Sequence, residues 1–493
     1  MNQADRCAKD AAITQHRLGY AAMQFPLSRS STLALCLGGA ALAALLGGFA
    51  YFDRAAGVPT HYVSHQLCSA VFVGGLDPQT FYKEAIQPAI APGDLLIHHQ
   101  IDRARREVTA DFAGLVKSRA VYRGALGCQV DHGMPQPDVA PEAPREKPLI
   151  PPIAGPEIVA PDTGALREAL DRAFAEPAAP PHRYTKAVVV VHDGKIVAER
   201  YAPGIGIDTP LIGWSMTKSV TNALIGILVK QHKISVDGPA PIAEWSDPRD
   251  PRHGIAIDHL LRMSSGLGFG QSLFDGWTDL FNPPSWMNFD MADQAGFAAQ
   301  ARLAVASGSR WTYTNGNTLL LSRIIRDATG GDAASAYRFA HRELFDKLGI
   351  EHATLEFDSV GTPVGSGHMW APARDWARFG MLYLNDGVVG GKRILPEGWV
   401  DYSARFTPGS DEFGYAAGFW TNRGTSTGAL QRVKAGMPAD SFMAVGSFGQ
   451  YTVVVPSARL VIVRLGTSYT WYGDIEATER LVADAVAAVH QGE

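Results

Sequence analysis

Strand-like segments lie at both ends of the C-terminal two-thirds of the chain, and helix-like segments lie between them. Residues 187–199 (AVVVVHDGKIVAE) contain two strand-like runs around Asp193-Gly194, a dipeptide that is typical of tight hairpin turns. A second pair of strands is expected within residues 450–465, followed by a helix over about 475–490. This order predicts an α+β fold in which an antiparallel sheet is packed by helices and carries an inserted helical subdomain.

The length and charge of the chain narrow the classes of function. A chain of 493 residues has room for about three domains and a large core. Its 44 lysine and arginine residues against 49 aspartate and glutamate residues give a net charge of −5, which excludes a general electrostatic attraction to nucleic acid. Neither a Cys-x-x-Cys nor a His-Glu-x-x-His spacing occurs, so the sequence predicts no metal site, and no motif indicates an organic cofactor.

An uncharged apolar run, residues 32–52, is long enough as a helix to cross the hydrocarbon core of a membrane, which is about 30 Å thick. The basic residues before it are Arg6, Lys9, Arg17 and Arg29. The bias of basic residues toward the cytoplasm predicts a cytoplasmic tail over 1–31, a transmembrane anchor over 32–52 in the inner membrane, and an extracytoplasmic or periplasmic remainder. The alternative is a cleaved signal peptide that ends near Ala50, with the same location for the remainder.

The four cysteines divide between these predicted compartments. Cys7 falls in the tail and Cys36 in the apolar run, which leaves Cys68 and Cys128 as the exported thiols. In an oxidising compartment these two are expected to form a disulfide, and the alternative is two buried, unpaired thiols.

Three further segments are expected after residue 52. Residues 53–134 are interpreted as a small accessory region with a short apolar strand over 70–73. Residues 135–157 contain proline too often for a helix or a central strand, so they predict an extended linker. The rest of the chain, 158–493, is expected to form the main domain.

A serine and a lysine stand three residues apart where the most apolar helix-like segment of the exported part begins. They are Ser215 and Lys218, within GWSMTK (213–218), and the apolar segment continues to about residue 229. Positions i and i+3 of a helix share one face, so both side chains are expected to point into the same space. This arrangement is typical of a serine nucleophile with a lysine as base, and the alternative is an ordinary helix start with a solvated lysine.

Tyr313 and Asn315 lie two residues apart between turn residues and the next apolar helix, so in an extended segment both face the same side. They are therefore candidates for a proton carrier and for a hydrogen-bonding contact to a substrate. A second Tyr-x-Asn, Tyr383 with Asn385, ends an amphipathic stretch and is interpreted as a core tyrosine and a helix C-cap.

Two closely spaced glycines, Gly446 and Gly449, precede the strand that starts near residue 450. Glycine lets the backbone approach a ligand closely, so an N–H of this segment is a candidate to face the nucleophile. The alternative is a bulge or a tight entry to an edge strand.

These elements together resemble the β-lactamase-like serine hydrolases, the superfamily of class C β-lactamases, D,D-peptidases and related esterases and amidases. The resemblance covers about residues 185–482 and is carried by SMTK (215–218), YTN (313–315), LLRMSSGL (260–267) and ARDWARFG (373–380). The segment AVGSFGQ (444–450) is most similar to the branch that contains 6-aminohexanoate-dimer hydrolase. The resemblance implies the β-lactamase and transpeptidase fold for the main domain.

The resemblance also implies a role for each matched residue. Ser215 would be the nucleophile, and Lys218 and Tyr313 the proton-transfer pair, with either of them as base. Asn315 would contact the substrate. The backbone N–H groups of Ser215 and Ser447, next to Gly446, would form the oxyanion hole.

One segment departs from the pattern of the penicillin-recognising members. They carry Lys-Thr-Gly, or a variant with histidine, on the last strand, whereas this chain has AVG at 444–446. With a shifted alignment, Ser441 is the nearest alternative for this position. Efficient turnover of penicillins is therefore not expected.

The expected function is hydrolysis of an amide or ester bond in a small-molecule or peptide-like substrate by a membrane-anchored, extracytoplasmic enzyme. The reaction would pass through an acyl-enzyme on Ser215 without a cofactor. The alternatives are a D,D-peptidase or β-lactamase at the cell wall, a non-catalytic protein of the same fold that binds peptidoglycan or a peptide, and a membrane scaffold. No oligomeric state is assigned.

Overall fold

The computed structural model describes residues 29–134, 139–140, 142, 147–270, 282–470 and 473–490, and for residues 29–47 and 49–50 it describes the backbone alone. The chain divides into two compact units, Met1–Phe52 and Asp53–Glu493. The predicted tail up to residue 28 and parts of the predicted linker lie outside the described residues. Residues 53–134, which were predicted as a separate accessory region, fall within the second unit.

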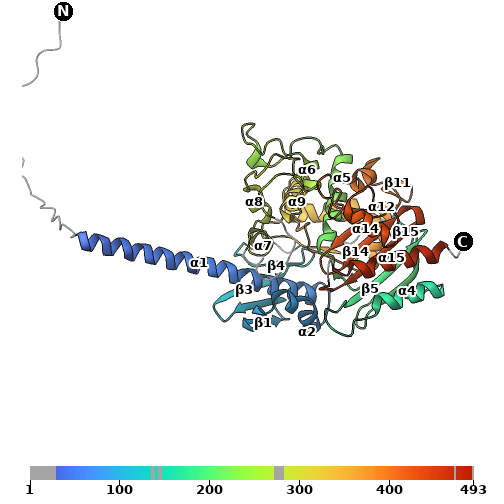
Figure 1. The fold of residues 1–493 in the computed structure, drawn as a ribbon, viewed down its shortest axis with the longest axis horizontal. Helices are drawn as coiled ribbons and strands as arrows, with labels where there is room; N and C mark the ends of the chain where they lie inside the picture. The colour runs from blue at the N-terminus through green and yellow to red at the C-terminus, as the bar shows by residue number, and fades with distance from the viewer. Residues whose placement is uncertain are drawn as a thin grey trace, which may run out of the picture. The chain divides into compact units, whose positions relative to one another are not determined.

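The core of the unit Asp53–Glu493 is a six-stranded antiparallel sheet with the order β12-β13-β14-β15-β5-β6, of which Figure 1 labels β14, β15 and β5. Its strands are β5 (Thr185–His192), β6 (Lys195–Tyr201), β12 (Trp420–Thr421), β13 (Phe442–Gly446), β14 (Gln450–Val455) and β15 (Leu460–Gly466). The β5–β6 connection turns at Asp193 and Gly194, whose φ values of 44° and 81° fit the hairpin that this dipeptide favours. The predicted strand pairs and the final helix α15 (Ile475–His490) are present, so the α+β prediction is confirmed.

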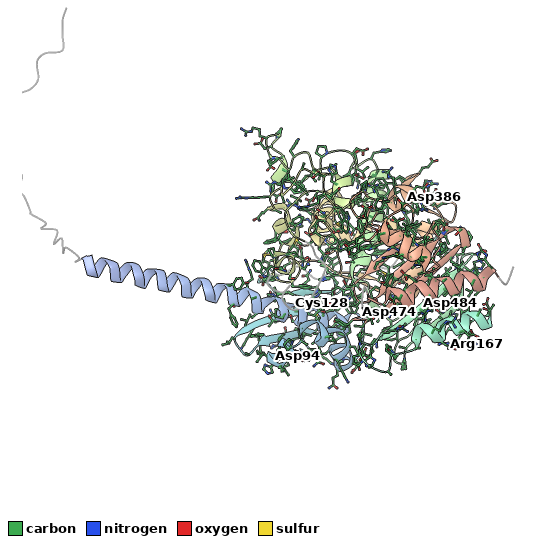
Figure 2. The ribbon with its side chains drawn as sticks, viewed as in Figure 1. Asp94, Cys128, Arg167, Asp386, Asp474 and Asp484 are labelled. Carbon is green, nitrogen blue, oxygen red and sulfur yellow. A yellow bond between two sulfur atoms is a disulfide. The ribbon has the colours of Figure 1, made fainter. Side chains whose placement is uncertain are left out.

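Helices cover both faces of this sheet. Val188 and Val190 of β5 pack toward α4 (Gly164–Phe174) and α15, whereas the alternate residues Val189 and Val191 pack into the larger core with α5 and α12. The helices α5 and α12 span Thr217–Lys230 and Ala373–Leu384. Asp484 on α15 and Arg167 on α4 mark the two neighbouring helices of the first face (Figure 2). Burial on both faces explains why the strands are almost continuously apolar in sequence.

A helical part is inserted between β6 and β12. Its helices include α6 (Ile257–Leu261), α7 (Pro283–Phe289), α8 (Gln294–Ala299), α9 (Asn315–Thr329), α10 (Ala333–Ala340), α11 (Asp346–Leu348) and α13 (Trp399–Ala404). Short helices η3 (Trp214–Met216), η4 (Ala243–Trp245) and η6 (His341–Phe345) accompany them, whereas α14 (Thr427–Lys434) follows β12 and η7 (Pro456–Ala458) follows β14. Two small antiparallel sheets pair β7 (Leu211–Ile212) with β9 (Met369–Ala371), β9 with β8 (Thr354–Leu355), and β10 (Val388–Val389) with β11 (Lys392–Arg393). Helix α5 packs on both β13 and α9, so it lies where the sheet meets the helical part.

Residues 53–134 form what we call the accessory module. It contains the C-terminal half of α1 (Arg29–Phe72), then α2 (Pro78–Phe81), η1 (Tyr82–Ile86), α3 (Gln87–Ile90), η2 (Gly93–Leu96), β1 (Ile97–Asp102), β2 (Glu107–Phe112), β3 (Val116–Tyr122) and β4 (Cys128–Val130). The four strands form one antiparallel sheet, and a disulfide joins Cys68 of α1 to Cys128 of β4 (Figure 2).

The strand predicted over 70–73 is wrong, because α1 continues as a helix to Phe72. The buried residues Val63, Leu67 and Ala70 follow helical spacing on one side of α1. A run of four apolar residues is too short for its period to distinguish a strand from a buried helix segment.

The predicted membrane anchor over 32–52 is also wrong. Across the part of the chain that the structure describes, no helix has both the length and the apolar character that a membrane span requires. The apolar run is instead part of the longer helix α1, which continues through Asp53 and Arg54 and whose later side chains are buried against the accessory module. The single-pass inner-membrane location, the extracytoplasmic placement and the membrane partner that rested on this anchor are withdrawn with it.

Candidate active site

Ser215 lies in η3, the short helix that leads from β7 into α5. The N–H of Gly213 donates to the carbonyl of Met369 at 2.8 Å, which fixes the chain just before η3. Trp214 has a φ of 45°, a left-handed conformation that costs about 1–3 kcal/mol for a residue other than glycine. A Cβ at position 213 would lie 2.2 Å from Cζ2 of Trp376, so this position requires glycine. The nucleophile candidate is therefore presented on a strained, tightly packed turn.

Lys218 lies one turn further along, at the start of α5, and its ammonium nitrogen contacts three oxygen atoms. Its Nζ is 3.0 Å from Oγ of Ser215, 2.6 Å from Oδ1 of Asn315 and 2.7 Å from the carbonyl oxygen of Ser366. The structure thus brings together the predicted residues Ser215, Lys218 and Asn315.

Burial changes the acidity of Lys218. The side chain is 3 % exposed, and burial lowers the pKa of its amine from the ordinary 10.5 to about 7. All three oxygens that it contacts are formally neutral, so none offsets the cost of burying a positive charge. Near neutral pH a large fraction of this lysine is therefore a free amine.

Tyr313 is buried in a group of aromatic side chains. Its ring lies 5.7 Å from that of Tyr415 and 5.6 Å from that of Trp420, and Nζ of Lys218 stands 4.9 Å from its centroid. Burial raises the pKa of the Tyr313 phenol well above its ordinary value, and a hydrogen bond with the Ser215 side chain opposes this shift only in part. Tyr313 is therefore a protonated phenol at neutral pH, next to the side chain of Ser215.

Asn315 is the first residue of α9, whose N-cap Thr314 accepts a hydrogen bond from the N–H of Gly316. The sequence predicts a contact between Asn315 and the substrate. In the structure its Oδ1 accepts a hydrogen bond from Lys218, so the observed contact of this side-chain oxygen is to the lysine.

The loop between β13 and β14 comes close to the backbone next to Ser215. A Cβ at Gly446 would lie 2.1 Å from the carbonyl oxygen of Gly213, so the two backbones are in direct contact. The side chain of Ser447 is exposed, and the ring of Phe448 packs edge-on against Trp214 at 5.6 Å. The loop thus lies beside Ser215, and the role of the Ser447 N–H in an oxyanion hole stays a prediction.

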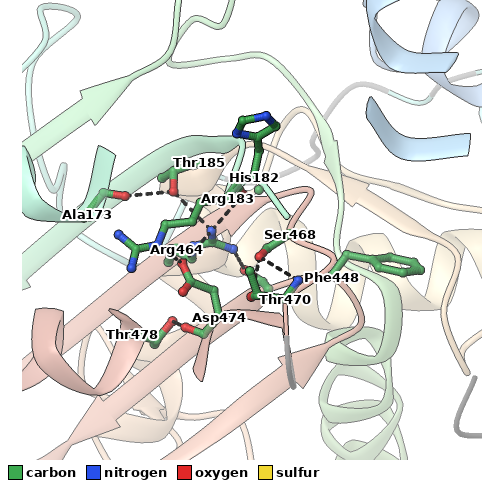
Figure 3. A network of polar contacts seen from close by, with 12 residues as sticks. Ala173, His182, Arg183, Thr185, Phe448, Arg464, Ser468, Thr470, Asp474 and Thr478 are labelled. Atoms are coloured by element: carbon green, nitrogen blue, oxygen red, sulfur yellow. Dashed lines mark hydrogen bonds and ion pairs between the residues drawn. The ribbon is translucent and has the colours of Figure 1, made fainter. Parts of the chain in front are cut away.

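Two buried polar residues hold this loop. Nη1 of Arg464 donates to the carbonyl of Gly449 at 2.6 Å, and Nε2 of Gln450 donates to the carbonyls of Ser447 and Phe448 at 3.1 and 3.2 Å. The N–H of Ser468 donates to the carbonyl of Phe448 at 2.8 Å (Figure 3). Three consecutive loop carbonyls are therefore fixed by hydrogen bonds from the neighbouring sheet.

Two other sequence interpretations involve residues away from this group. Ser441 lies beyond the opposite end of β13 from Gly446, and its buried hydroxyl accepts from Nδ2 of Asn422 at 2.9 Å. The hydroxyl of Tyr383 is buried and donates to Asn222 at 2.6 Å, while Asn385 is the C-cap of α12. This second Tyr-x-Asn is thus a core tyrosine with a helix cap, as interpreted.

Sequence reasoning missed two parts of the site. The carbonyl of Ser366, which contacts Lys218, is a backbone group without a residue-type signature, although GSG at 365–367 is a glycine-rich signal for a close approach. The accessory module also contributes, because the ring of Tyr62 on α1 stacks on Trp214 with the centroids 6.4 Å apart. Nothing in the sequence of the module indicates this contact.

A family model described as Beta-lactamase matches residues 170–487 of the chain, a range that includes the whole group around Ser215. The chain belongs to the beta-lactamase family. The match confirms the resemblance and the fold that the sequence implies. The first 169 residues, with the accessory module, lie outside the matched range.

Relatives in this family include hydrolases. The 6-aminohexanoate-dimer hydrolase of Paenarthrobacter ureafaciens is 25 % identical over 295 residues, which cover 57 % of this chain and 72 % of that protein. A family VIII carboxylesterase has a similar structure, with a TM-score of 0.52, 15 % identity, and coverage of 68 % of this chain and 99 % of the other. A penicillin-binding protein homologue from Caulobacter crescentus has a TM-score of 0.51 at 16 % identity and covers 67 % of this chain and 98 % of its own. At these identities the two structures establish the fold alone.

Proposed function

We propose that this member of the beta-lactamase family is a serine hydrolase that cleaves an amide or ester bond through an acyl-enzyme on Ser215. The observation that carries the proposal is the position of the Lys218 amine, which lies 3.0 Å from the hydroxyl of Ser215 and is buried enough for its pKa to fall to about 7. A serine hydroxyl attacks a carbonyl only when a neighbouring base accepts its proton.

The contacts of Lys218 favour it as that base. A neutral amine has two N–H groups and one lone pair. Asn315 and the carbonyl of Ser366 accept the two hydrogens, at 2.6 and 2.7 Å, which leaves the lone pair for the proton of Ser215. General-base assistance of this kind contributes about 10²- to 10⁴-fold in rate.

Tyr313 is suited to the opposite task. Its pKa is raised by burial, so it keeps its proton at neutral pH and can give it to the leaving amine or alcohol as the bond breaks. The ammonium of Lys218, next to its ring, would return a proton to the phenolate. A water molecule would then release the acyl group from Ser215 by the same steps in reverse, which restores both residues.

The substrate is proposed to be a linear amide or an ester. The relative named 6-aminohexanoate-dimer hydrolase supports the amide. The strand β13 presents Ala444 and Val445 before Gly446, so it has no side-chain cation for the carboxylate of a β-lactam. We therefore expect slow turnover of penicillins.

The test is covalent labelling of the full chain with a fluorophosphonate probe, followed by intact mass measurement. Wild-type protein should gain one probe per chain, and Ser215→Ala should gain none. The variant should also lose at least about 10³-fold in kcat/KM on p-nitrophenyl butyrate and on a linear amide such as the 6-aminohexanoate dimer. A fluorescent penicillin serves as the competing probe.

The matched control is Ser457→Ala, because this exposed serine lies at the far end of β14 from the site. It should label and turn over substrate like the wild type. Labelling of Ser215→Ala at the wild-type rate would overturn the assignment of the nucleophile. A folded wild-type protein that neither probe labels would favour a non-catalytic binding protein instead.

A further inference from the structure

Three buried side chains from distant segments meet beside the candidate active site. They are His65 on α1, Glu356 just after β8, and His368 just before β9, with exposures of 6 %, 0 % and 6 %. One donor atom of each lies within 4.8 Å of the donor atoms of the other two. The rings of His65 and His368 are stacked with their centroids 4.7 Å apart.

The distance between two of the three donors fits a tetrahedral metal ion. Nε2 of His65 and Oε2 of Glu356 are 3.3 Å apart, and the same Nε2 lies 3.1 Å from the carbonyl oxygen of Cys128, a contact that an ion would replace. Two donors that each lie about 2.0–2.1 Å from a tetrahedral zinc ion are about 3.3–3.4 Å from each other.

Glu356 is oriented for such a role by its other oxygen. Its Oε1 accepts hydrogen bonds from Oγ of Ser69 at 2.6 Å and from the N–H of Cys128 at 3.0 Å. Its Oε2 is buried, and the contact that the described residues give it is the ion pair with Nε2 of His65 at 3.3 Å. This single long contact leaves a lone pair of the buried oxygen for a metal ion, and metal-binding carboxylates are commonly held through their second oxygen in this way.

A cavity lies next to the two histidines. His65 and His368 line a space of about 30 Å³, which is enough for a water-sized ligand beside them, whereas Glu356 is not part of its wall. Further polar residues on the cavity wall include His132, Gln129 and Asp358.

We propose that His65, Glu356 and His368 bind one divalent transition-metal ion of the zinc class, with a water molecule at the remaining position. Two imidazoles and one carboxylate are donors that zinc accepts. Sequence spacing does not reveal the site, because the three residues are supplied by α1 and by the two ends of the segment 356–368.

The ion would connect two parts of the protein. Its ligands join the accessory module to the segment 356–368, which includes Ser366, whose carbonyl holds the amine of Lys218 at 2.7 Å. The metal would therefore act on the reaction by positioning Lys218.

The test measures metal content and binding in the full chain. Wild-type protein, stripped with a chelator and titrated with Zn²⁺ in a calorimeter, should bind one ion per chain, and its melting temperature should fall on stripping and recover on refilling. Co²⁺ should give the visible spectrum of a tetrahedral nitrogen and oxygen site, without the thiolate band that Cys7 or Cys36 would produce.

The variants His65→Ala, His368→Ala and Glu356→Gln should each weaken Zn²⁺ binding by about tenfold or more, with unchanged far-ultraviolet circular dichroism. The matched control is His132→Ala, since His132 lines the same cavity and is outside the proposed ligand set. It should bind Zn²⁺ like the wild type.

Absence of stoichiometric binding to the wild type would overturn the proposal and leave His65 and Glu356 as an ion pair. Equal binding by the three variants and the wild type, or loss of the ion in His132→Ala, would overturn it as well. The inference is separable from the proposed function, because Ser215→Ala should lose activity and keep its metal.

Discussion

Lys218 and Arg464 are both buried basic residues, and they differ in the groups that surround their nitrogen atoms. Arg464 lies in β15, 2 % exposed, where it donates to the carbonyl of Gly449 and to the hydroxyl of Thr185, and its Nη2 lies 3.4 Å from the carboxylate of Asp474 (Figure 3). Lys218 contacts only neutral oxygens among the described residues.

The difference supports a structural role for Arg464 and the chemical role that we propose for Lys218. An arginine keeps its proton in proteins, and Asp474 compensates its charge, so Arg464 is a fixed anchor for the loop 447–449. A lysine without a carboxylate partner releases its proton readily when buried. This agrees with our proposal that Lys218 exchanges a proton with Ser215.

The largest effect is expected from Lys218→Met, which keeps the volume and removes the amine. We expect kcat/KM to fall by about 10³-fold or more, with the protein still folded. The unfolded chain binds the lysine proton up to pH 10.5 and the folded chain only up to about 7, so the wild-type free energy of unfolding should rise with pH across this window. The variant should lose this rise, which denaturant titrations at several pH values would measure.

The control is Lys392→Met, because Lys392 is exposed on β11. It should keep both the activity and the pH dependence of stability. Wild-type activity in Lys218→Met would contradict the role of the amine as base and would favour Tyr313.

Arg464→Met should act on stability. The variant removes one of two arginine partners of Asp474, whose Oδ2 also lies 3.3 Å from Nε of Arg183, and it removes the donor to the carbonyl of Gly449. We expect a loss of about 1–3 kcal/mol in the free energy of unfolding, less than a fully uncompensated buried charge costs. Chemical denaturation of the variant measures this loss. The double variant Arg464→Met with Asp474→Asn should recover part of it, and a single variant as stable as the wild type would show that the pair is not the anchor that we describe.

The smallest effect is expected from Asn315→Asp, which places a carboxylate next to Lys218, as Asp474 lies next to Arg464. Wild-type kcat/KM should fall about tenfold per pH unit below about pH 7, as the amine becomes protonated. A carboxylate in place of the amide oxygen, 2.6 Å from Nζ, should raise the pKa of Lys218. The acidic limb of the pH profile of kcat/KM should therefore move to higher pH by about 1–3 units.

The measurement is the pH profile of kcat/KM for both proteins. At pH 7 the variant should be slower by about tenfold or more and should recover in alkaline buffer. An unshifted limb with uniformly low activity would mean that Asn315 acts on the substrate and not through the lysine.

Local patterns predicted the parts of the molecule that local interactions determine. The hairpin at Asp193-Gly194 follows from the left-handed turn that this dipeptide favours, and the nearness of Ser215 to Lys218 follows from helical spacing. Tyr313 was predicted from its place before an apolar helix, and the structure places its ring 4.9 Å from Nζ of Lys218, while its role in proton transfer stays a prediction.

The rest depended on contacts between distant segments. The carbonyl of Ser366 has no residue type to recognise, and the meeting of His65 with Glu356 and His368 requires the accessory module to be docked first. The apolar run 32–52 was misread because its length suggests a bilayer, whereas helix α1 extends well beyond it to Phe72. Sequence composition measures how apolar a segment is, and it does not specify what covers it.

The contact between Gly446 and the carbonyl of Gly213 also limits how this enzyme can be redesigned. No side chain fits at Gly446 unless the backbone before Ser215 moves, so a saturation library at this position should yield almost only inactive clones. Useful diversity is to be sought in the neighbouring positions with exposed side chains, such as Ser447. A search for new substrates should therefore leave Gly213 and Gly446 unchanged and vary the exposed positions next to them.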